Sequence, residues 1–405
     1  PASSSGAAPE PGAGTDASAA TDAAAGSDTA SATDPGAGAD PGAATDPGAA
    51  TDPGAATDPG AAADPAVTTT SESGVSNRGI DEEQPVAATP AAIPHPPEAE
   101  DAGGNLTGEG KREGGVIVIG NTALEFYGFV EKNNDRYADI INKFDDKYRG
   151  QITTAALVAP TNIEFKLPEK YDDLSDNQRR AINYIYEHMN ADIAKVDVYD
   201  VLKERANEYV YFRTDHHWTQ LGAYYAYRDY CETLGLPHTA LLSYSRIRLD
   251  GFLGSFYNSI GGNKSMKKNP DFVLAYAPVV PYEATGYFDS AMESGFDLSL
   301  IRGSDEIEVS NKYLAFSGGD LPIIDIKMQS NTGRRLILFK ESFANAFIPF
   351  LTENYDEIIV VDFRYFEGSV NHLIKKYKIN EALFLNYVSA AGSEKQVSRL
   401  SALFN

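Results

Sequence analysis

Three short polar segments hold the side chains whose types and spacing could do chemistry together. They are RTDHHWT at residues 213–219, KES at 340–342 and DFR at 362–364. Each follows a run of residues typical of a strand, and the first two also precede an expected helix. Ligands of open α/β sheets bind beyond the carboxyl ends of the strands. We therefore expect the three segments to meet at one edge of a sheet and to form a single site.

Ser342 has the surroundings that an activated nucleophile needs. A tight turn between strand and helix exposes its hydroxyl, and the N–H groups that begin the helix face a developing oxyanion. A serine hydroxyl is weakly nucleophilic until a base accepts its proton. Asp215 and His217 lie two residues apart, so the carboxylate can hold one ring nitrogen while the other faces the serine. The spacing thus permits a triad of Asp215, His217 and Ser342.

Other interpretations of the same residues stay open at this point. A serine that opens a helix is most often an N-cap. Carboxylate and imidazole groups both ligate metals, so Asp215, His216 and His217 could hold a metal ion. Asp215 could equally cap the helix and leave the two histidines exposed. Spacing alone does not decide among these possibilities.

The elements that must position these segments alternate between strand and helix. Apolar runs predict strands at residues 114–120, 152–160, 195–200, 208–213, 334–340, 357–363 and 381–388. Helices are predicted at residues 133–148, from Ser175 with Gln178 completing a capping box, and at 218–234, 343–354, 369–378 and from Ser393. This alternation favours an α/β fold with a doubly wound, mostly parallel sheet. Residues 236–330 break the rhythm, so we expect residues 111–235 and 331–405 to build one sheet around a β-rich insertion.

The first 110 residues differ in composition from the rest. From Thr33 they repeat the sequence TDPGAA, and no large apolar side chain occurs before Val67. Such a segment cannot bury enough surface to offset the entropy of ordering it. We predict a disordered Ala/Asp/Pro/Gly/Thr-rich spacer over residues 1–110 and a folded domain over residues 111–405.

The net charge of −24 lies mostly in that spacer, which carries 18 acidic side chains and one basic one, Arg78. The other 295 residues carry 40 acidic and 33 basic side chains, which is an ordinary balance. Without a basic patch the chain is not expected to bind nucleic acid. A lone Cys231 cannot form an intrachain disulfide or a cysteine zinc site. No apolar run approaches the ~18 residues that span a membrane.

The chain begins at Pro1 rather than at methionine, which favours an N-terminal signal peptide or membrane anchor that has been removed. A long, charged, disordered spacer suits a catalytic head that reaches through a cell wall. We therefore expect an extracytoplasmic protein, secreted or tethered to the cell surface, whose only membrane contact is through such an anchor.

The segment FRTDHHWTQLGAYYAY, at residues 212–227, resembles the signature of the DHHW protein family. Further segments resemble that family in the same order along residues 114–390: ALVAPTNIEFKLPEKY, GSFYNSIGG, AFSGG, LFKESFANAFIPFL and VVDFRYF. The family is similar to SGNH-type polysaccharide O-acetyltransferases, such as the alginate acetyltransferases. Their Asp-x-His-Trp motif supplies the aspartate and histidine of a triad, and the serine follows later. The resemblance therefore implies an SGNH-like fold with Asp215, His217 and Ser342 as catalytic residues.

The resemblance also implies residues that bind substrate. Arg364 matches an arginine that relatives place near the acyl or glycan pocket, although an ion pair with Asp362 would explain it as well. Asn386 and Tyr387 end the next strand and could complete the site. Trp218 either stacks on a sugar or packs beneath the histidine loop.

The donors that would stabilise an oxyanion are less evident. SGNH enzymes use a Gly/Asn pair, for which Gly319 and Asn345 are the candidates here. Glu341 stands where relatives often have an aspartate before the serine. We expect His216, which lies one residue off the triad histidine, to face away from Ser342.

Together these features predict an SGNH-like enzyme that moves an acetyl group onto or off a cell-surface polysaccharide through an acyl-serine intermediate. Its partners would be a polysaccharide acceptor and an acetyl donor, either protein or small molecule, with no cofactor and no metal. Two alternatives remain. One is a non-catalytic module that binds polysaccharide or a partner on a degenerate SGNH fold, and the other is a metal-dependent hydrolase that uses Asp215, His216 and His217.

Overall fold

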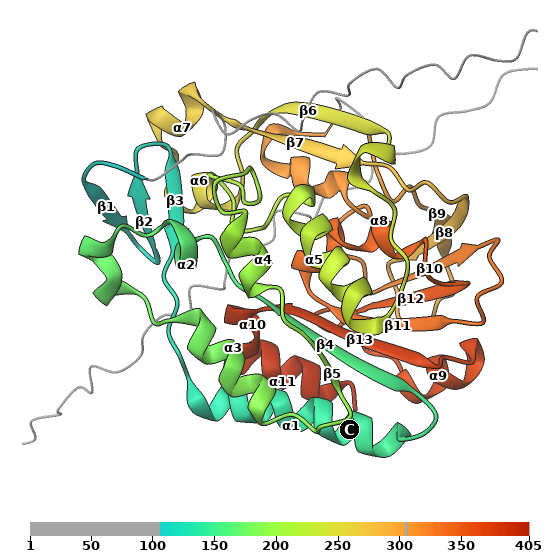
Figure 1. Cartoon of the computed structure of the whole chain (residues 1–405). Coiled ribbons are helices and arrows are strands. Elements are labelled where there is room, and N and C mark those ends of the chain that lie inside the picture. Colours follow the sequence, from blue (N-terminus) through green and yellow to red (C-terminus); the bar gives the residue numbers. More distant parts are fainter. Residues whose placement is uncertain (1–105, 304–306, 405) are drawn as a thin grey trace, which may run out of the picture. The chain divides into compact units, whose positions relative to one another are not determined.

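The computed structural model describes residues 106–303 and 307–404 (Figure 1). The spacer prediction for residues 1–110 concerns mainly residues outside this described part, so it stays a prediction. Within the described ranges, no helix combines the length and the apolar character needed to cross a membrane.

A central eight-stranded sheet organises the described part, with strand order β5-β4-β13-β11-β12-β10-β8-β9. The strands are β4 (Thr153–Ala159), β5 (Ala194–Val196), β8 (Tyr282–Tyr287), β9 (Gly295–Asp297), β10 (Ile323–Met328), β11 (Arg335–Lys340), β12 (Glu357–Asp362) and β13 (Glu381–Tyr387). From β5 to β12 the neighbours are parallel, and β10, β8 and β9 extend the sheet with antiparallel pairing. The predicted α/β class is confirmed, and the sheet is mixed.

The prediction that residues 236–330 form an insertion outside the main sheet is wrong. They supply β8, β9 and β10 to the central sheet, and only β6 (Arg246–Phe252) and β7 (Asp271–Tyr276) pair separately. The reason is visible in β10, where Ile323 packs into the core on one face and Ile324 into the core on the other. A strand that is apolar on both faces needs a sheet that is covered on both sides.

Two predicted strands of the main sheet lie elsewhere. The apolar run at 114–120 forms β2 (Val116–Ile119), which pairs with β1 (Gly110–Glu113) and β3 (Thr122–Glu125) in a small antiparallel sheet. The run at 208–213 forms no strand, and only an isolated bridge joins Tyr211 to Trp218. Instead, this run forms a backbone hydrogen bond with the loop that follows it: the Phe212 N–H donates to the carbonyl of His217.

Helices cover both faces of the central sheet (Figure 1). One face packs against α1 (Glu131–Tyr148), α3 (Gln178–Glu187), α9 (Val370–Tyr377), α10 (Val388–Gly392) and α11 (Glu394–Ala402). The other packs against α4 (Tyr199–Glu204), α5 (Gln220–Leu234) and α8 (Ile348–Leu351). The connections hold short helices: α2 (Ile163–Lys166), α6 (Ser255–Ser259), α7 (Lys264–Lys268) and the 3₁₀ turns η1 (Glu169–Leu174), η2 (Leu241–Ser243), η3 (Val309–Ala315) and η4 (Ser342–Ala346).

Two predicted helices begin differently from the prediction. The N-cap of α3 is Asn177, whose side chain accepts from Arg180 N–H, whereas Ser175 Oγ accepts from Tyr127 N–H. The predicted helix at 343–354 is instead the 3₁₀ turn η4 followed by the short α8. Pro349 near the start of α8 has no N–H to continue a preceding helix.

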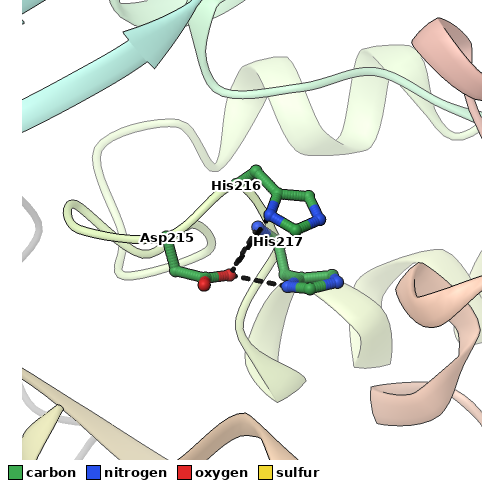
Figure 2. A group of neighbouring side chains, drawn as sticks. All are labelled: Asp215, His216 and His217. Carbon is green, nitrogen blue, oxygen red and sulfur yellow. Dashed lines mark hydrogen bonds and ion pairs between the residues drawn. The ribbon is translucent and has the colours of Figure 1, made fainter. Parts of the chain in front are cut away.

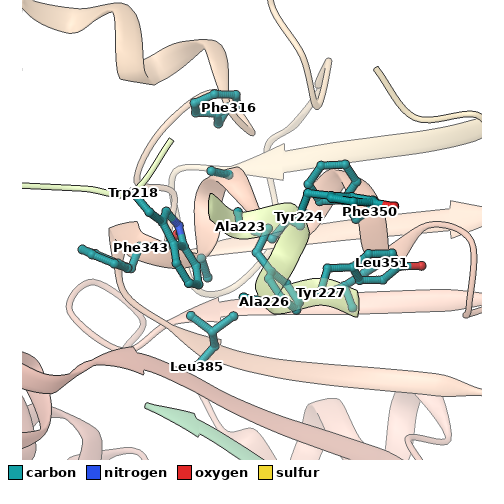
Figure 3. Packing of buried hydrophobic residues seen from close by; sticks show 14 of the residues in the cluster. Trp218, Ala223, Tyr224, Ala226, Tyr227, Phe316, Phe343, Phe350, Leu351 and Leu385 are labelled. Carbon is teal, nitrogen blue, oxygen red and sulfur yellow. The ribbon is translucent and has the colours of Figure 1, made fainter. Parts of the chain in front are cut away.

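The central strands alternate between two cores, as a strand between helical layers should. On β11, Leu338 points toward α5 and α8, while Phe339 points toward α1 and α11. Figure 3 shows the first core, where aromatic rings of α5 meet Phe350 of α8 and Trp218 meets Phe343. The carboxyl end of β11 is therefore packed on both faces, and Ser342 lies two residues beyond the end of this strand.

Replacing Phe339 with alanine should lower the free energy of unfolding by about 3–5 kcal/mol, because its buried ring contacts Phe144, Phe384 and Phe404. Phe288→Ala is the matched control, since its ring is 74% exposed, and it should change that free energy by no more than about 0.5 kcal/mol. Denaturant unfolding of both variants checks the difference, and equal losses would contradict the packing described for β11.

Candidate active site

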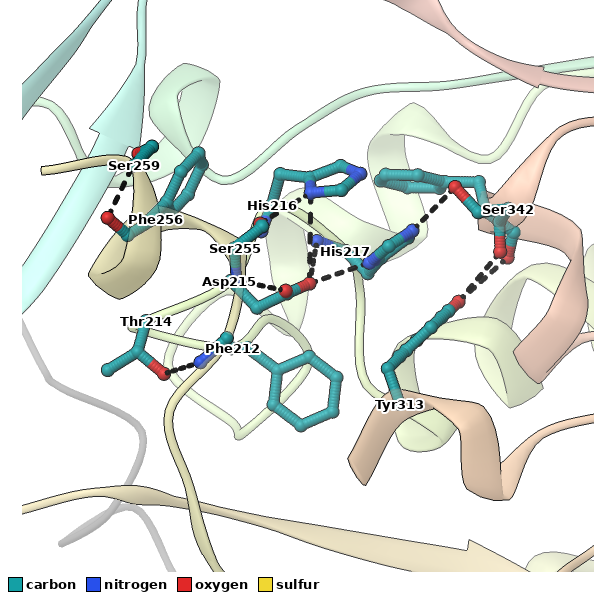
Figure 4. Close-up of polar contacts among 12 residues, drawn as sticks. Phe212, Thr214, Asp215, His216, His217, Ser255, Phe256, Ser259, Tyr313 and Ser342 are labelled. Atoms are coloured by element: carbon teal, nitrogen blue, oxygen red, sulfur yellow. Dashed lines mark hydrogen bonds and ion pairs between the residues drawn. The ribbon is translucent and has the colours of Figure 1, made fainter. Parts of the chain in front are cut away.

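Asp215, His217 and Ser342 form a continuous hydrogen-bonded chain (Figure 4). Asp215 Oδ1 lies 2.6 Å from His217 Nδ1, and His217 Nε2 lies 2.8 Å from Ser342 Oγ. A carboxylate only accepts hydrogen bonds, so Nδ1 carries the proton and Nε2 accepts from the serine hydroxyl. This is the arrangement in which an imidazole can take the proton of a serine nucleophile.

The Asp215 carboxylate is fully engaged by backbone as well as by the histidine. Its Oδ1 also accepts from His217 N–H at 3.0 Å, and its Oδ2 accepts from Ser255 N–H at 2.8 Å. Burial by itself would raise the pKa of Asp215, but His217, His216 and the Ser255 N–H outweigh burial and hold that pKa well below its usual range. Asp215 is therefore ionised in the folded protein and orients the imidazole.

Gly254 makes room for this carboxylate. A Cβ atom at position 254 would lie 2.4 Å from both Cβ and Oδ2 of Asp215, a separation that no side chain tolerates. Gly254 and Ser255 open the GSFYNSIGG segment that carries part of the family resemblance. The structure thus gives these two residues a physical role, which is to close around Asp215.

A second buried carboxylate holds the loop in front of Asp215, and the sequence pattern did not reveal it. Asp271, the first residue of β7, accepts from the N–H groups of Arg213 at 3.0 Å and Thr214 at 2.7 Å. It also accepts from Arg213 Nε at 2.9 Å and from Thr214 Oγ1 at 2.6 Å. An acidic residue that begins a strand has no distinctive sequence pattern, because its partners lie 57 and 58 residues away.

Aromatic rings lie on both faces of His217. Tyr313 of η3 stacks on one face, with the centroids 3.8 Å apart, and donates its hydroxyl to the carbonyl of Ser342 at 3.0 Å. The ring of His216 lies on the other face at a centroid distance of 3.7 Å. His216 therefore packs against the histidine that contacts Ser342, and the expectation that it faces away from Ser342 itself stays a prediction. Tyr313 was not foreseen, since a tyrosine in a short 3₁₀ turn shows no pattern of its own.

Trp218 belongs to the support of the site and not to its surface. It is fully buried, and its Nε1 donates to the carbonyl of Phe343 at 2.7 Å. Of the two roles considered for this residue, packing beneath the histidine loop is the one that this position allows. The prediction that Trp218 contacts substrate is wrong, because no sugar can reach an enclosed ring.

Glu341 caps the turn that carries the nucleophile. Its Oε2 accepts from Phe343 N–H at 2.9 Å and lies 3.4 Å from Ser342 Oγ, and its Oε1 accepts from Tyr387 N–H at 3.1 Å. Burial raises the pKa of Glu341 above its usual range. The alternative in which Ser342 is the N-cap is therefore wrong, because Glu341 occupies that position.

A buried charge network lies beside the nucleophile turn. Lys340 Nζ is 2.8 Å from Asp362 Oδ2, and Arg364 grips the same carboxylate with Nε at 2.9 Å and Nη2 at 2.7 Å. Arg364 Nη2 also lies 2.8 Å from Asp320 Oδ1. Burial would raise the pKa of Asp320, but Arg364, Lys340 and Asn345 hold it below its usual range. The alternative considered for Arg364, an ion pair with Asp362, is present, and the pair is nearly buried.

Of the two predicted oxyanion donors, Gly319 is engaged elsewhere, so that prediction is wrong for this conformation, whereas Asn345 uses only one of its two amide N–H groups and stays a candidate. The Asn345 amide accepts from Lys340 Nζ at 2.8 Å and donates to Asp320 Oδ1 at 3.0 Å. The N–H of Gly319 donates to the carbonyl of Phe316 at 3.1 Å. Sequence position therefore did not reveal that the Gly319 N–H has an acceptor within its own turn.

The two residues at the end of β13 have different surroundings. Asn386 is buried and accepts from Tyr137 of α1 at 2.8 Å, so its side chain does not lie on a substrate-accessible surface, contrary to the prediction. Tyr387 is partly exposed, stacks on Phe343 with centroids 5.0 Å apart, and lies 6.1 Å from the His216 ring. Tyr387 remains a candidate for substrate contact.

Asp215, His216 and His217 also place potential metal ligands within 4.8 Å of one another (Figure 2). Their protein contacts fit the triad better than a metal centre. Each ring nitrogen of His217 already has a protein partner, so His217 would ligate a metal only by losing Asp215 or Ser342. His216 Nδ1 is likewise engaged by Ser255 Oγ at 2.8 Å.

The substitution Gly254→Ala should lower the free energy of unfolding by about 1–3 kcal/mol, because the new methyl group overlaps the Asp215 side chain. Gly128→Ala is the control, since nothing lies within 4 Å of a Cβ atom at that position. It should leave the stability unchanged or raise it slightly. Thermal or denaturant unfolding measures both, and a Gly254→Ala protein as stable as the control would contradict the close contact.

Comparisons with known proteins bear on the family and the fold of the chain. The DHHW protein family profile matches residues 68–361. A crystal structure of a DHHW family protein from Eubacterium siraeum is 31% identical with a TM-score of 0.65, and the match covers 72% of this chain and 96% of that one. PatB1 of Bacillus cereus is 21% identical with a TM-score of 0.59, over 69% and 97% of the two chains.

A structure of PatB1 with a sulfonyl adduct is 20% identical with a TM-score of 0.57, over 69% of this chain and 98% of that one, and like the other PatB1 structure it supports the fold. No match was found among curated proteins. The extent of the family match and the similarity to the Eubacterium siraeum protein confirm the resemblance inferred from the sequence. The chain belongs to the DHHW protein family.

Proposed function

We propose that this protein is a serine-dependent acyl-transfer enzyme that moves an acetyl group onto, or off, a cell-surface polysaccharide. The observation that carries the proposal is the unbroken chain from Asp215 through His217 to Ser342, at 2.6 Å and 2.8 Å. The acetyl group and the polysaccharide come from the resemblance of the DHHW segment to SGNH-type O-acetyltransferases.

The reaction would proceed in two steps. In the first, His217 Nε2 takes the proton of Ser342 as Oγ attacks the carbonyl carbon of the acetyl donor, and the leaving group then receives that proton. In the second, His217 takes a proton from the acceptor, whose oxygen attacks the acetyl-serine ester, and Ser342 recovers its proton. Throughout, the ionised Asp215 stabilises the imidazolium and holds its tautomer.

The acceptor decides whether the enzyme is a transferase or an esterase. A sugar hydroxyl gives an O-acetylated polysaccharide, and water gives hydrolysis. Ser342 is only 8% exposed, which favours an acceptor that is held in place over bulk water. Arg364 and Tyr387 border the nucleophile turn and are our candidates for holding the sugar.

The working location that we propose is outside the cytoplasm. The proposal rests on the composition of residues 1–110, whose acidic Pro/Gly/Ala repeats suit a spacer between a cell-surface anchor and the folded head. The acetyl donor would then be an extracytoplasmic protein or small molecule.

A non-catalytic polysaccharide-binding module is the second candidate, and one observation favours it. The N–H of Gly319 and one N–H of the Asn345 amide already have acceptors, as a degenerate SGNH site would also show. The acetyl ester assay below separates the two, since a binding module has no turnover.

Purified protein should hydrolyse p-nitrophenyl acetate and accumulate an acetyl group on Ser342 that mass spectrometry of peptides detects. Each of Ser342→Ala, His217→Ala and Asp215→Ala should lower kcat by about 10³-fold or more, because each removes one member of the proton-transfer chain. His372→Ala, on the exposed side of α9, is the control and should keep full activity. Equal rates in all five proteins would exclude the enzyme.

Treatment with a chelator distinguishes the triad from a metal-dependent hydrolase. Because both ring nitrogens of His217 have protein partners, EDTA should leave the ester hydrolysis unchanged, and added Zn²⁺ should not restore Ser342→Ala. Activity that EDTA removes, that Zn²⁺ restores and that survives Ser342→Ala would instead support a metal held by Asp215, His216 and His217.

A further inference from the structure

The site as described has a nucleophile, a base and an orienting carboxylate, but the predicted donors to an oxyanion have other partners. The N–H of Phe343, which directly follows the nucleophile, is also engaged, because it donates to Glu341 Oε2 at 2.9 Å. The N–H of Ala344 donates to the carbonyl of Glu341 at 3.2 Å. The N–H of Ser342 itself donates to no acceptor within residues 106–303 or 307–404 and can serve the oxyanion of an intermediate formed on Oγ. A second donor would strengthen that stabilisation.

His216 lies beside the histidine that contacts the nucleophile. Its ring packs against that of His217, the partner of Ser342 Oγ, with the ring centroids 3.7 Å apart and the planes tilted by 37° (Figure 4). It also lies 6.4 Å from the Phe343 ring, and the Glu341 carboxylate, which is itself 3.4 Å from Ser342 Oγ, is near enough to act on the pKa of His216. His216 is thus packed against the reacting pair without belonging to the triad.

Exposure indicates the side from which substrate can arrive at the two histidines. The face of His217 opposite His216 is closed by Tyr313, whose residue is 7% exposed. The side chain of His217 is also 7% exposed, whereas that of His216 is 25% exposed. A substrate that approaches His217 and Ser342 from the side of the histidine loop therefore comes close to His216.

The partners of His216 leave one ring nitrogen for substrate. Nδ1 is 2.8 Å from Ser255 Oγ, and Asp215 Oδ1 at 3.9 Å is beyond hydrogen-bond distance. No group in residues 106–303 or 307–404 is hydrogen-bonded to Nε2. Ser255 Oγ already accepts from the His216 backbone N–H at 3.4 Å, so its own hydrogen can point to Nδ1 and leave the proton on Nε2.

We propose that His216 Nε2–H donates a hydrogen bond to the acyl oxygen that becomes negative during attack by Ser342. This assignment rests on the proposed acyl-transfer function and adds a side-chain donor to the oxyanion beside the N–H of Ser342. Ser255 fixes the tautomer, and the contact with His217 restricts the ring, so the donor is held in place before the reaction begins.

Charges around the ring are consistent with a neutral donor. Burial, together with the neighbouring His217, lowers the pKa of His216, while the carboxylates of Asp215, Glu125 and Glu341 act in the opposite direction. The net lowering keeps His216 uncharged near neutral pH. A neutral imidazole with its proton on Nε2 can donate there without giving that proton away.

Two substitutions separate hydrogen-bond donation from simple packing. His216→Phe keeps an aromatic ring to stack on His217 and removes the donor, whereas His216→Gln removes the ring and keeps an amide N–H close to the position of Nε2. The rate of Ser342 acetylation by p-nitrophenyl acetate is measured in a single turnover, from the first release of p-nitrophenol. We expect His216→Phe to acetylate about 10²-fold more slowly than the wild type and His216→Gln to retain clearly more activity.

The opposite ranking, with His216→Phe close to the wild type, or equal losses in both variants, would overturn the assignment. Thermal unfolding of each variant accompanies the rates. If either variant fails to fold, Ser255→Ala replaces the pair, because it keeps the His216 ring and removes the hydroxyl that contacts Nδ1 and the backbone N–H of His216. It should slow acetylation without changing the melting temperature. A Ser255→Ala enzyme that acetylates at the wild-type rate would then overturn the assignment.

The design also separates this assignment from the proposed function. A wild-type protein that forms no acetyl-Ser342 contradicts both. A wild type that forms it, with a Ser342→Ala variant that does not, supports the function, and the His216 variants then test the donor alone.

Discussion

The buried charge of Asp215 is the constraint on which the rest of the site depends. An ionised carboxylate inside a protein is costly unless hydrogen bonds and opposite charge replace its water shell. Asp215 obtains these from His217 and from the Ser255 N–H, and it can do so only because residue 254 is glycine. Satisfying this one group therefore fixes the imidazole, the loop that carries it and the start of α6.

A second set of buried charges acts on the nucleophile from the other side. Lys340, Asp362 and Arg364 form a network at the ends of β11 and β12, and Glu341 joins the end of β11 to the end of β13 through Tyr387 N–H. Removing a partner from such a network leaves an uncompensated charge, so these groups hold one another in place. Ser342 lies between these two sets of buried charges. Moving its turn would break hydrogen bonds in one set or the other.

This arrangement concentrates rigidity where an acyl-transfer enzyme would need it. His217 is held between Tyr313 and His216, and its support extends to the fully buried Trp218. Groups that are oriented before the reaction do not have to reorganise as charge develops. The partly exposed residues at the site, His216 and Tyr387 among them, are those that a substrate can still contact.

Much of the fold followed from the sequence, because it depends on local patterns. The apolar run of β4, β11, β12 and β13 and the helical spacing of α1 and α9 predicted the parallel half of the sheet and its covering layers. The local sequence pattern failed to predict which strands pair when the pairing partner lies far away in the sequence. The strands β8, β9 and β10 appeared to belong to an insertion, and the run at 208–213 resembled a strand although its bonds close on its own loop.

For the site, the sequence by itself determined the chemistry that is available: a family motif with Asp215 and His217, and a serine at a strand-to-helix junction. Only the tertiary structure decided that these groups touch, since His217 and Ser342 are 125 residues apart. It also decided that Trp218 and Asn386 are buried, that Asn345 and Gly319 have other partners, and that Asp271, Tyr313 and Gly254 support the loop. The physical reason is that a residue type sets which bonds a side chain can form, whereas its partner depends on which distant segments the packing of the two cores brings beside it.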